Sequence, residues 1–119
     1  MVEPTLARWF KPSFRDANPA LMKRVGGWIR GTPVAGYLGT SAAIPTIDVT
    51  ERLGEIAIPC LVIVGADDIA MPVPMAQVLA RGIPDSQLAV IPDAGHISNI
   101  EQPGAFNAAL EGFYRKIAE

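Results

Sequence analysis

A run of five apolar residues, Cys60 to Val64 (CLVIV), limits the folds available to this chain more than any other stretch of it. The run shows no alternation of apolar and polar residues, which is typical of a strand covered on both faces in a parallel sheet. A second strand is predicted at residues 87–91 (QLAVI), and Pro74 opens a predicted helix between the two strands. This order of elements predicts a parallel βαβ unit with a right-handed crossover.

The end of the chain adds a helix to this unit. Residues 103–119 place Phe106, Leu110, Phe113 and Ile117 at helical spacing, which gives the helix one apolar face to lie on the sheet. Two strands are too few for a sheet of this kind, because its faces and its central edges need neighbouring elements. We therefore predict the α/β class, with a βαβα unit in this chain and the rest of the sheet outside it.

Three helices and no strand are predicted ahead of Pro45. Two of them open on a cap residue followed by proline, Asn18–Pro19 and Thr32–Pro33. We therefore divide the chain into a helical segment, residues 1–47, and an α/β segment, residues 48–119.

Composition excludes several classes of function. Half of the 119 residues are hydrophobic, and ten Lys and Arg against twelve Asp and Glu argue against a nucleic-acid partner. The single cysteine, Cys60, cannot form an internal disulfide and fits a reducing compartment. The longest apolar run (IPCLVIVGA) is about half of a membrane span, and the amino terminus lacks the apolar core of a signal peptide. We therefore expect a cytoplasmic protein without a membrane partner.

Polar residues follow both predicted strands. Asp67 and Asp68 come after the first strand, in VGADDIAMP. Asp93 and the only histidine, His96, come after the second, in IPDAGHIS. Because the chemistry of open α/β sheets gathers at the carboxyl ends of the strands, we expect these two loops to meet. An acid beside an imidazole is the base and orienting-acid pair of a nucleophilic catalytic triad.

Each of these residues also has a structural interpretation. His96 can be a surface-turn histidine, and Asp68 can be a turn or helix-capping acid, with Asp67 competing for the same role. Asp93 fits a turn, and Glu101 fits an acid that is favourable near the amino terminus of the last helix.

At these motifs the sequence resembles the α/β-hydrolase family. PCLVIVGADDIAMP followed by IPDAGHISNIEQPGAF is similar to the carboxyl-terminal third of such enzymes, with Gly-x-x-Asp after one strand, Gly-His after the next, and Glu-x-Pro before the last helix. The resemblance implies that Asp68, third after Gly65, is the triad acid, that His96 is the base, and that residues 1–47 are the later part of a lid. LARWFKPSF, NPA and GYLGTSAAI resemble in particular the 3-oxoadipate enol-lactonases, which open an enol-lactone ring in aromatic degradation.

The chain departs from that family at the nucleophile. The family's Gly-x-Ser-x-Gly elbow and its earlier oxyanion loop are not found in the sequence. Ser41, in GTSAA, is a near-match that stays open as an alternative, but no buried strand leads into it, so we interpret it as a small residue on a helix. The expected partner is therefore the amino-terminal half of the same hydrolase, or a second copy of this chain joined through the open sheet edge.

The predicted function is that of an acid- and base-bearing part of a serine hydrolase acting on a small carboxylic ester or enol-lactone, with no cofactor or metal. Alone, the chain is expected to be inactive. Trp9, Trp28 and Tyr37 are candidate substrate contacts, although packing within the helical segment is the simpler explanation. The alternative function is a non-catalytic piece of a hydrolase that associates through its exposed sheet edge.

Overall fold

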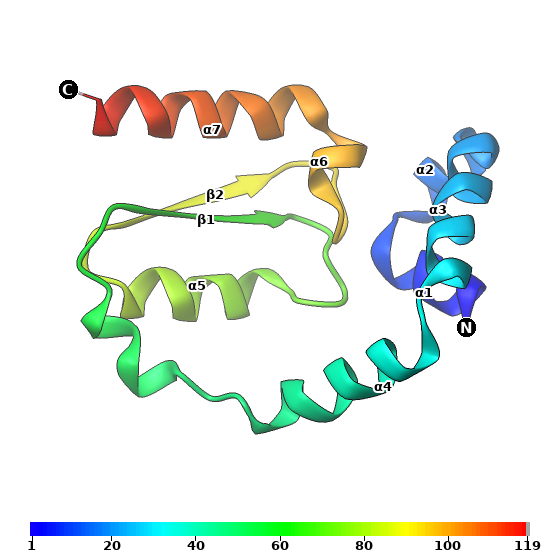
Figure 1. Ribbon diagram of the computed structural model, residues 1–119. Helices are drawn as coiled ribbons and strands as arrows, with labels where there is room; N and C mark the ends of the chain where they lie inside the picture. Colours follow the sequence, from blue (N-terminus) through cyan, green and yellow to red (C-terminus); the bar gives the residue numbers. More distant parts are fainter. Residues whose placement is uncertain (119) are drawn as a thin grey trace.

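The computed structural model describes residues 1–118 and combines a cluster of helices with a two-stranded sheet held between helices (Figure 1). The helical segment contains α1 (Val2–Trp9), α2 (Pro12–Ala17), α3 (Pro19–Gly31), α4 (Val34–Ala43) and the 3-10 turn η1 (Ile44–Thr46). The α/β segment contains the 3-10 turn η2 (Thr50–Glu55), β1 (Cys60–Gly65), α5 (Val73–Gly82), β2 (Ser86–Ile91), α6 (Ser98–Glu101) and α7 (Pro103–Ile117).

The two strands are parallel, as predicted. Their register pairs Cys60 with Ser86 at one end and Gly65 with Ile91 at the other. Helices α5 and α7 lie on opposite faces of this sheet, and the α1–α3 cluster lies beyond the carboxyl ends of both strands (Figure 1). The α/β class and the βαβα unit are therefore confirmed, and the loops expected to carry chemistry leave the sheet at one edge.

The apolar run of β1 is only partly covered. Cys60 to Ile63 are half-buried, and burial is complete only at Val64 and Gly65. Within residues 1–118, β2 is the only strand paired with β1, so the other edge of β1 keeps its backbone donors and acceptors unpaired by a sheet neighbour. Strand β1 therefore has the sequence of an inner strand and the surroundings of an edge strand.

The helical segment has a small core of its own, made by Leu6, Phe10, Met22 and Val25. Helix α4 does not join this core, because none of its residues is buried, and it runs from the end of α3 back toward the segment before β1 without lying on the sheet (Figure 1). None of the helices in residues 1–118 is long and apolar enough to cross a membrane.

One predicted helix cap and one predicted helix boundary differ from those observed. Helix α3 begins at Pro19 as expected, but the Asn18 side chain donates to the carbonyl of Phe14 instead of capping the helix. Thr32 ends α3 and does not open α4, since its hydroxyl donates to the carbonyl of Trp28 four residues back. Helix α2, which was not predicted, lies between α1 and α3 in the sequence. Short polar side chains bond to nearby carbonyls as readily as they cap, which explains both differences.

Candidate active site

Asp68 and His96 form a direct pair at the carboxyl edge of the sheet. Asp68 lies in the loop after β1 and His96 in the loop after β2, and Asp68 Oδ2 is 2.9 Å from His96 Nδ1. The Asp68 side chain is 4% exposed and that of His96 is 31% exposed, so the acid is buried beneath an imidazole that reaches the surface. A buried carboxylate at Nδ1 selects the tautomer and the orientation of the ring.

The two oxygens of Asp68 have separate partners. Oδ1 accepts hydrogen bonds from the backbone N–H groups of Ala70, at 2.8 Å, and Met71, at 2.9 Å. These two hydrogen bonds fix the Asp68 carboxylate and leave its Oδ2 atom for the imidazole. Asp67 does not compete, because its carboxylate forms an ion pair with Lys11 at 2.9 Å. The structure therefore pairs His96 with the acid that the spacing from Gly65 predicted.

Gly65 allows the two loops to approach each other. A Cβ atom at this position would overlap the carbonyl oxygens of Ala94 and Gly95 in the loop after β2. The same approach lets the N–H of Asp67 donate to the carbonyl of Ala94 at 2.9 Å. The Gly of Gly-x-x-Asp is therefore needed for the backbone contact that brings the acid to the base.

The loop that carries His96 is also held from the helical segment. The carbonyl of Trp9 accepts the N–H of His96 at 2.9 Å and that of Ile97 at 3.3 Å. At the start of this loop Asp93 has φ 54°, in the left-handed region that Asp tolerates better than most residues.

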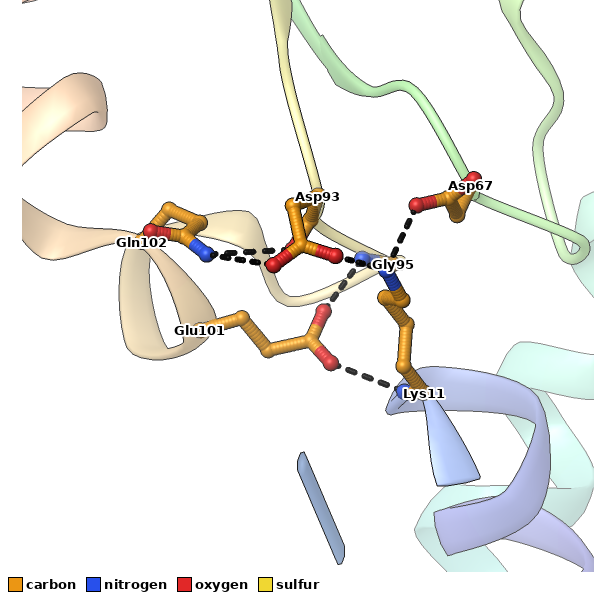
Figure 2. Close-up of polar contacts among 6 residues, drawn as sticks. All are labelled: Lys11, Asp67, Asp93, Gly95, Glu101 and Gln102. Atoms are coloured by element: carbon orange, nitrogen blue, oxygen red, sulfur yellow. Dashed lines mark hydrogen bonds and ion pairs between the residues drawn. The ribbon is translucent and has the colours of Figure 1, made fainter. Parts of the chain in front are cut away.

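Glu101 has a role that the sequence analysis did not find. Its carboxylate is buried and accepts the N–H of Gly95 through one oxygen and that of Lys11, at 2.8 Å, through the other (Figure 2). It therefore satisfies two backbone donors and does more than complement a helix terminus. The only sequence signal for it was the Glu-x-Pro motif.

A hollow of about 410 Å³, called here the sheet-edge hollow, opens beside the acid–base pair. Its lining includes Val62, Ile63 and Val64 of β1, together with Asp68 and His96. Consecutive strand residues point to opposite faces, so three in a row mark the open edge of β1 rather than one face. Because Asp68 holds Nδ1, the free nitrogen of the imidazole is Nε2, for which residues 1–118 supply no hydrogen-bond partner.

The remaining candidate residues lie in the helical segment. Trp9 and Tyr37 line a second hollow of about 430 Å³ between α1, α3 and α4, called here the helix hollow. Trp28 lies outside the lining of that hollow and is 54% exposed, with the Arg24 guanidinium 5.2 Å from its ring centroid. Trp28 is therefore outside the core of the helical segment, and its ring contact is with Arg24 of the same helix.

Ser41 lies in the last turn of α4 and is exposed. Its near-match to the serine elbow is therefore part of a helix, and no strand leads into it. Among residues 1–118 there is no group of three or more His, Cys, Asp or Glu side chains that could hold a metal ion.

Comparison with known proteins points to the same family as the sequence motifs. The chain is 35% identical over 116 residues to 3-oxoadipate enol-lactonase 2 of Acinetobacter baylyi, covering 98% of this chain and 43% of that protein. The enol-lactonase of Burkholderia xenovorans superposes with a TM-score of 0.91 at 29% identity, over 96% of this chain and 44% of that one. A thermophilic esterase from Thermogutta terrifontis superposes with a TM-score of 0.85 at 32% identity, over 98% and 43%.

This chain thus spans less than half the length of the relatives that it matches. The match to the family model described as the alpha/beta hydrolase fold covers residues 12–103, which include both loops of the acid–base pair. The chain belongs to the α/β-hydrolase fold family.

Proposed function

We propose that this chain supplies the general base, His96, and the orienting acid, Asp68, of a serine-dependent hydrolase whose nucleophile lies outside these residues. The observation that carries the proposal is the 2.9 Å contact of Asp68 Oδ2 with His96 Nδ1, with Nε2 left free beside the sheet-edge hollow. An imidazole held in this way accepts the proton of an attacking hydroxyl at Nε2 and later returns it to the leaving group. The carboxylate stabilises the imidazolium formed between these steps.

The proposed substrate is a small carboxylic ester or enol-lactone. Two of the relatives are named enol-lactonases and one is named an esterase, and both reactions break an acyl C–O bond. The helical segment, residues 1–47, is proposed to be part of a lid, because α1 to α3 lie beyond the carboxyl ends of the strands where the pair is found (Figure 1). The single cysteine supports a cytoplasmic location.

Joining this chain to the part of a relative that it does not match tests the proposal. The part of the Acinetobacter baylyi relative that the match leaves out would be fused ahead of Met1 and assayed on an aryl ester and on an enol-lactone. We expect hydrolysis by the fusion, its loss in His96→Ala, and no turnover by the 119-residue chain above free imidazole. A fluorophosphonate probe should label the fusion and leave the isolated chain unlabelled.

Two results would overturn the proposal. One is a folded, probe-reactive fusion that keeps its full rate after His96→Ala. The other is stoichiometric labelling of Ser41 in the isolated chain, which would place the nucleophile in α4.

A second candidate function follows from the open edge of β1. Around that edge Met75, Val78 and Leu79 of α5 are 51%, 42% and 43% exposed, and they line the sheet-edge hollow together with residues of β1. A non-catalytic chain that self-associates through this surface would use the same residues without any hydrolysis. The two candidates differ in the fusion assay, because only the first requires activity that depends on His96.

A further inference from the structure

The last residue of α1 and the two residues that follow it, called here the 9–11 turn, contact both loops of the candidate site. Its first residue, Trp9, accepts the backbone N–H of His96, as described above. Its last residue, Lys11, uses the backbone N–H for Glu101 and the side chain for two further carboxylates (Figure 2). The 9–11 turn therefore lies where two loops meet. These are the loop after β1 with Asp68, called here the acid loop, and the loop after β2 with His96, called here the base loop.

The Lys11 ammonium bridges the two loops. It forms ion pairs with Asp67, at 2.9 Å, and with Asp93. Asp67 is the chain neighbour of the triad acid Asp68, and Asp93 begins the loop that carries His96. Gln102 adds to the same junction by donating to the carbonyl of Asp93 at 3.2 Å. The ammonium thus joins one residue on each side of the acid–base pair.

These ion pairs are poor candidates for stabilising the fold. The side chains of Asp67 and Asp93 are 50% and 72% exposed, and exposed ion pairs contribute little to the free energy of folding. Their geometry has another consequence, because displacing catalytic groups by about 1 Å can lower a rate roughly 100-fold. Because Lys11 joins the two loops that carry Asp68 and His96, it limits how far these two side chains can shift relative to each other.

We propose that Lys11 and Glu101 are positioning residues that hold the 9–11 turn against both loops and thereby align the His96 ring with Asp68. Glu101 fixes the turn and the base loop to each other through the N–H groups of Lys11 and Gly95. Lys11 then fixes the acid loop to the base loop. The inference rests on the proposed roles of Asp68 and His96, and it makes the helical segment a part of the alignment of the site.

Nuclear magnetic resonance of the isolated chain tests the alignment without any activity, because His96 is the only histidine. The readouts are the downfield Nδ1–H proton of the ring and the hydrogen exchange of the His96 backbone N–H. In Lys11→Met we expect the ring proton to be broadened or lost and the backbone exchange to be about tenfold faster. Lys11→Arg should restore both signals, and Lys23→Met, an exposed lysine on α3, should match the unmodified chain.

A triple variant separates alignment from charge. If Lys11 acted only by neutralising its neighbours, then Lys11→Met with Asp67→Asn and Asp93→Asn would recover the ring proton. We expect no recovery, because the bridge between the loops is still missing. Recovery in the triple variant, or an unchanged spectrum in Lys11→Met, would overturn the inference.

Folding is checked by circular dichroism on every variant. If Lys11→Met does not fold, Asp93→Asn replaces it, because Asn also tolerates the left-handed conformation and only the ionic acceptor is lost. Glu101→Gln should likewise weaken the ring proton, since the amide keeps only one acceptor oxygen for two N–H groups. A folded Asp93→Asn and a folded Glu101→Gln with unchanged spectra would contradict the inference.

The fusion distinguishes this inference from the proposed function. There, Lys11→Met should lower kcat about tenfold or more with little change in KM, as expected for a misaligned base. An effect on the His96 spectrum without His96-dependent hydrolysis would leave the alignment standing and reject the triad role. Hydrolysis that depends on His96 but not on Lys11 would support the triad role and reject the alignment by Lys11.

Discussion

The carboxyl edge of the sheet and the open flank of β1 are built in opposite ways. At the carboxyl edge, Asp68, Glu101 and Lys11 all find partners inside the chain, and contacts join residues 90 positions apart in the sequence. Along the open flank, which comprises the free edge of β1 with Met75, Val78 and Leu79 of α5, apolar side chains face outward. Residues 1–118 thus satisfy their polar groups at the carboxyl edge and leave one edge of β1 without a strand neighbour.

Some features of the α/β-hydrolase fold therefore form within a short stretch of chain, and others need elements from elsewhere. The acid–base pair needs only two neighbouring strands and the turn that braces their loops, all of which lie within residues 1–118. The covering of β1 needs another strand, because a parallel inner strand is stabilised from both edges. Local unfolding should therefore begin at the open flank, while the carboxyl edge opens last.

Gly65→Ala should have the largest effect, because it breaks the carboxyl edge directly. The new Cβ would overlap two backbone carbonyl oxygens, which cannot rotate away as a side chain can. We expect a loss of about 3 kcal/mol in the free energy of unfolding, at the upper end for overpacking, together with loss of the His96 ring-proton signal. Denaturant titration measures the former.

The matched control for that substitution is Gly112→Ala in α7, where a Cβ would meet nothing within 4 Å. It should stabilise the chain by about 0.5–1 kcal/mol, because alanine is the better helix residue. Equal destabilisation by both substitutions would mean that the two loops do not approach as closely as described.

Glu101→Ala should destabilise the same edge by about 1–3 kcal/mol, because it leaves the buried N–H group of Gly95 and the partly buried N–H group of Lys11 without an acceptor. Glu111→Ala is the control, because Glu111 is exposed and its ion pair with Arg115, at 3.6 Å, lies on the surface and contributes little to stability. Thermal unfolding of both variants measures the difference. A loss no greater than that of Glu111→Ala would show that the Glu101 carboxylate is not the acceptor.

The open flank should mediate self-association of the isolated chain. Covering a Leu side chain is worth about 1.5–3 kcal/mol, so Leu79→Lys should weaken association at least about tenfold in sedimentation velocity. Tyr114→Lys, on the outer side of α7 and 61% exposed, should leave association unchanged. A compact, cooperatively folding monomer at micromolar concentration would contradict this prediction and would require the helical segment to cover β1 in solution.

The smallest effect is a pH dependence at the carboxyl edge. The hydrogen bonds that Lys11 donates to Asp93 and, with a smaller effect, to Asp67 raise the pKa of Lys11 above its ordinary value of 10.5. A raised pKa of a cation adds stability that is complete below 10.5 and is lost as the pH rises through the higher value of the folded state. The difference in unfolding free energy between Lys11→Met and the unmodified chain should therefore be constant from pH 7 to about 10 and shrink only above that.

Local patterns in the sequence were enough to predict the βαβα unit and the meeting of the two polar loops, and the resemblance to the α/β-hydrolase family then selected Asp68 over Asp67. Asp68 and His96 follow strands whose apolar runs are short and bounded, and parallel strands present their carboxyl ends at one edge. Lys11 and Glu101 could not be found this way, because their contacts are set by how the helical segment docks on the sheet. Thr32 was misplaced for a local reason, since a threonine hydroxyl bonds to a preceding carbonyl as easily as it caps a following helix.

We propose that Asp68, and not its neighbour Asp67, orients His96 as the base of a hydrolase. Hydrolysis by the fusion protein carrying Asp68→Asn or Asp67→Asn tests it most directly, because the two substitutions make the same chemical change one residue apart. We expect Asp68→Asn to lower kcat by about 10⁴-fold, as loss of the orienting carboxylate does in a triad, and Asp67→Asn to lower it far less. Equal losses, or a greater loss in Asp67→Asn, would contradict the account.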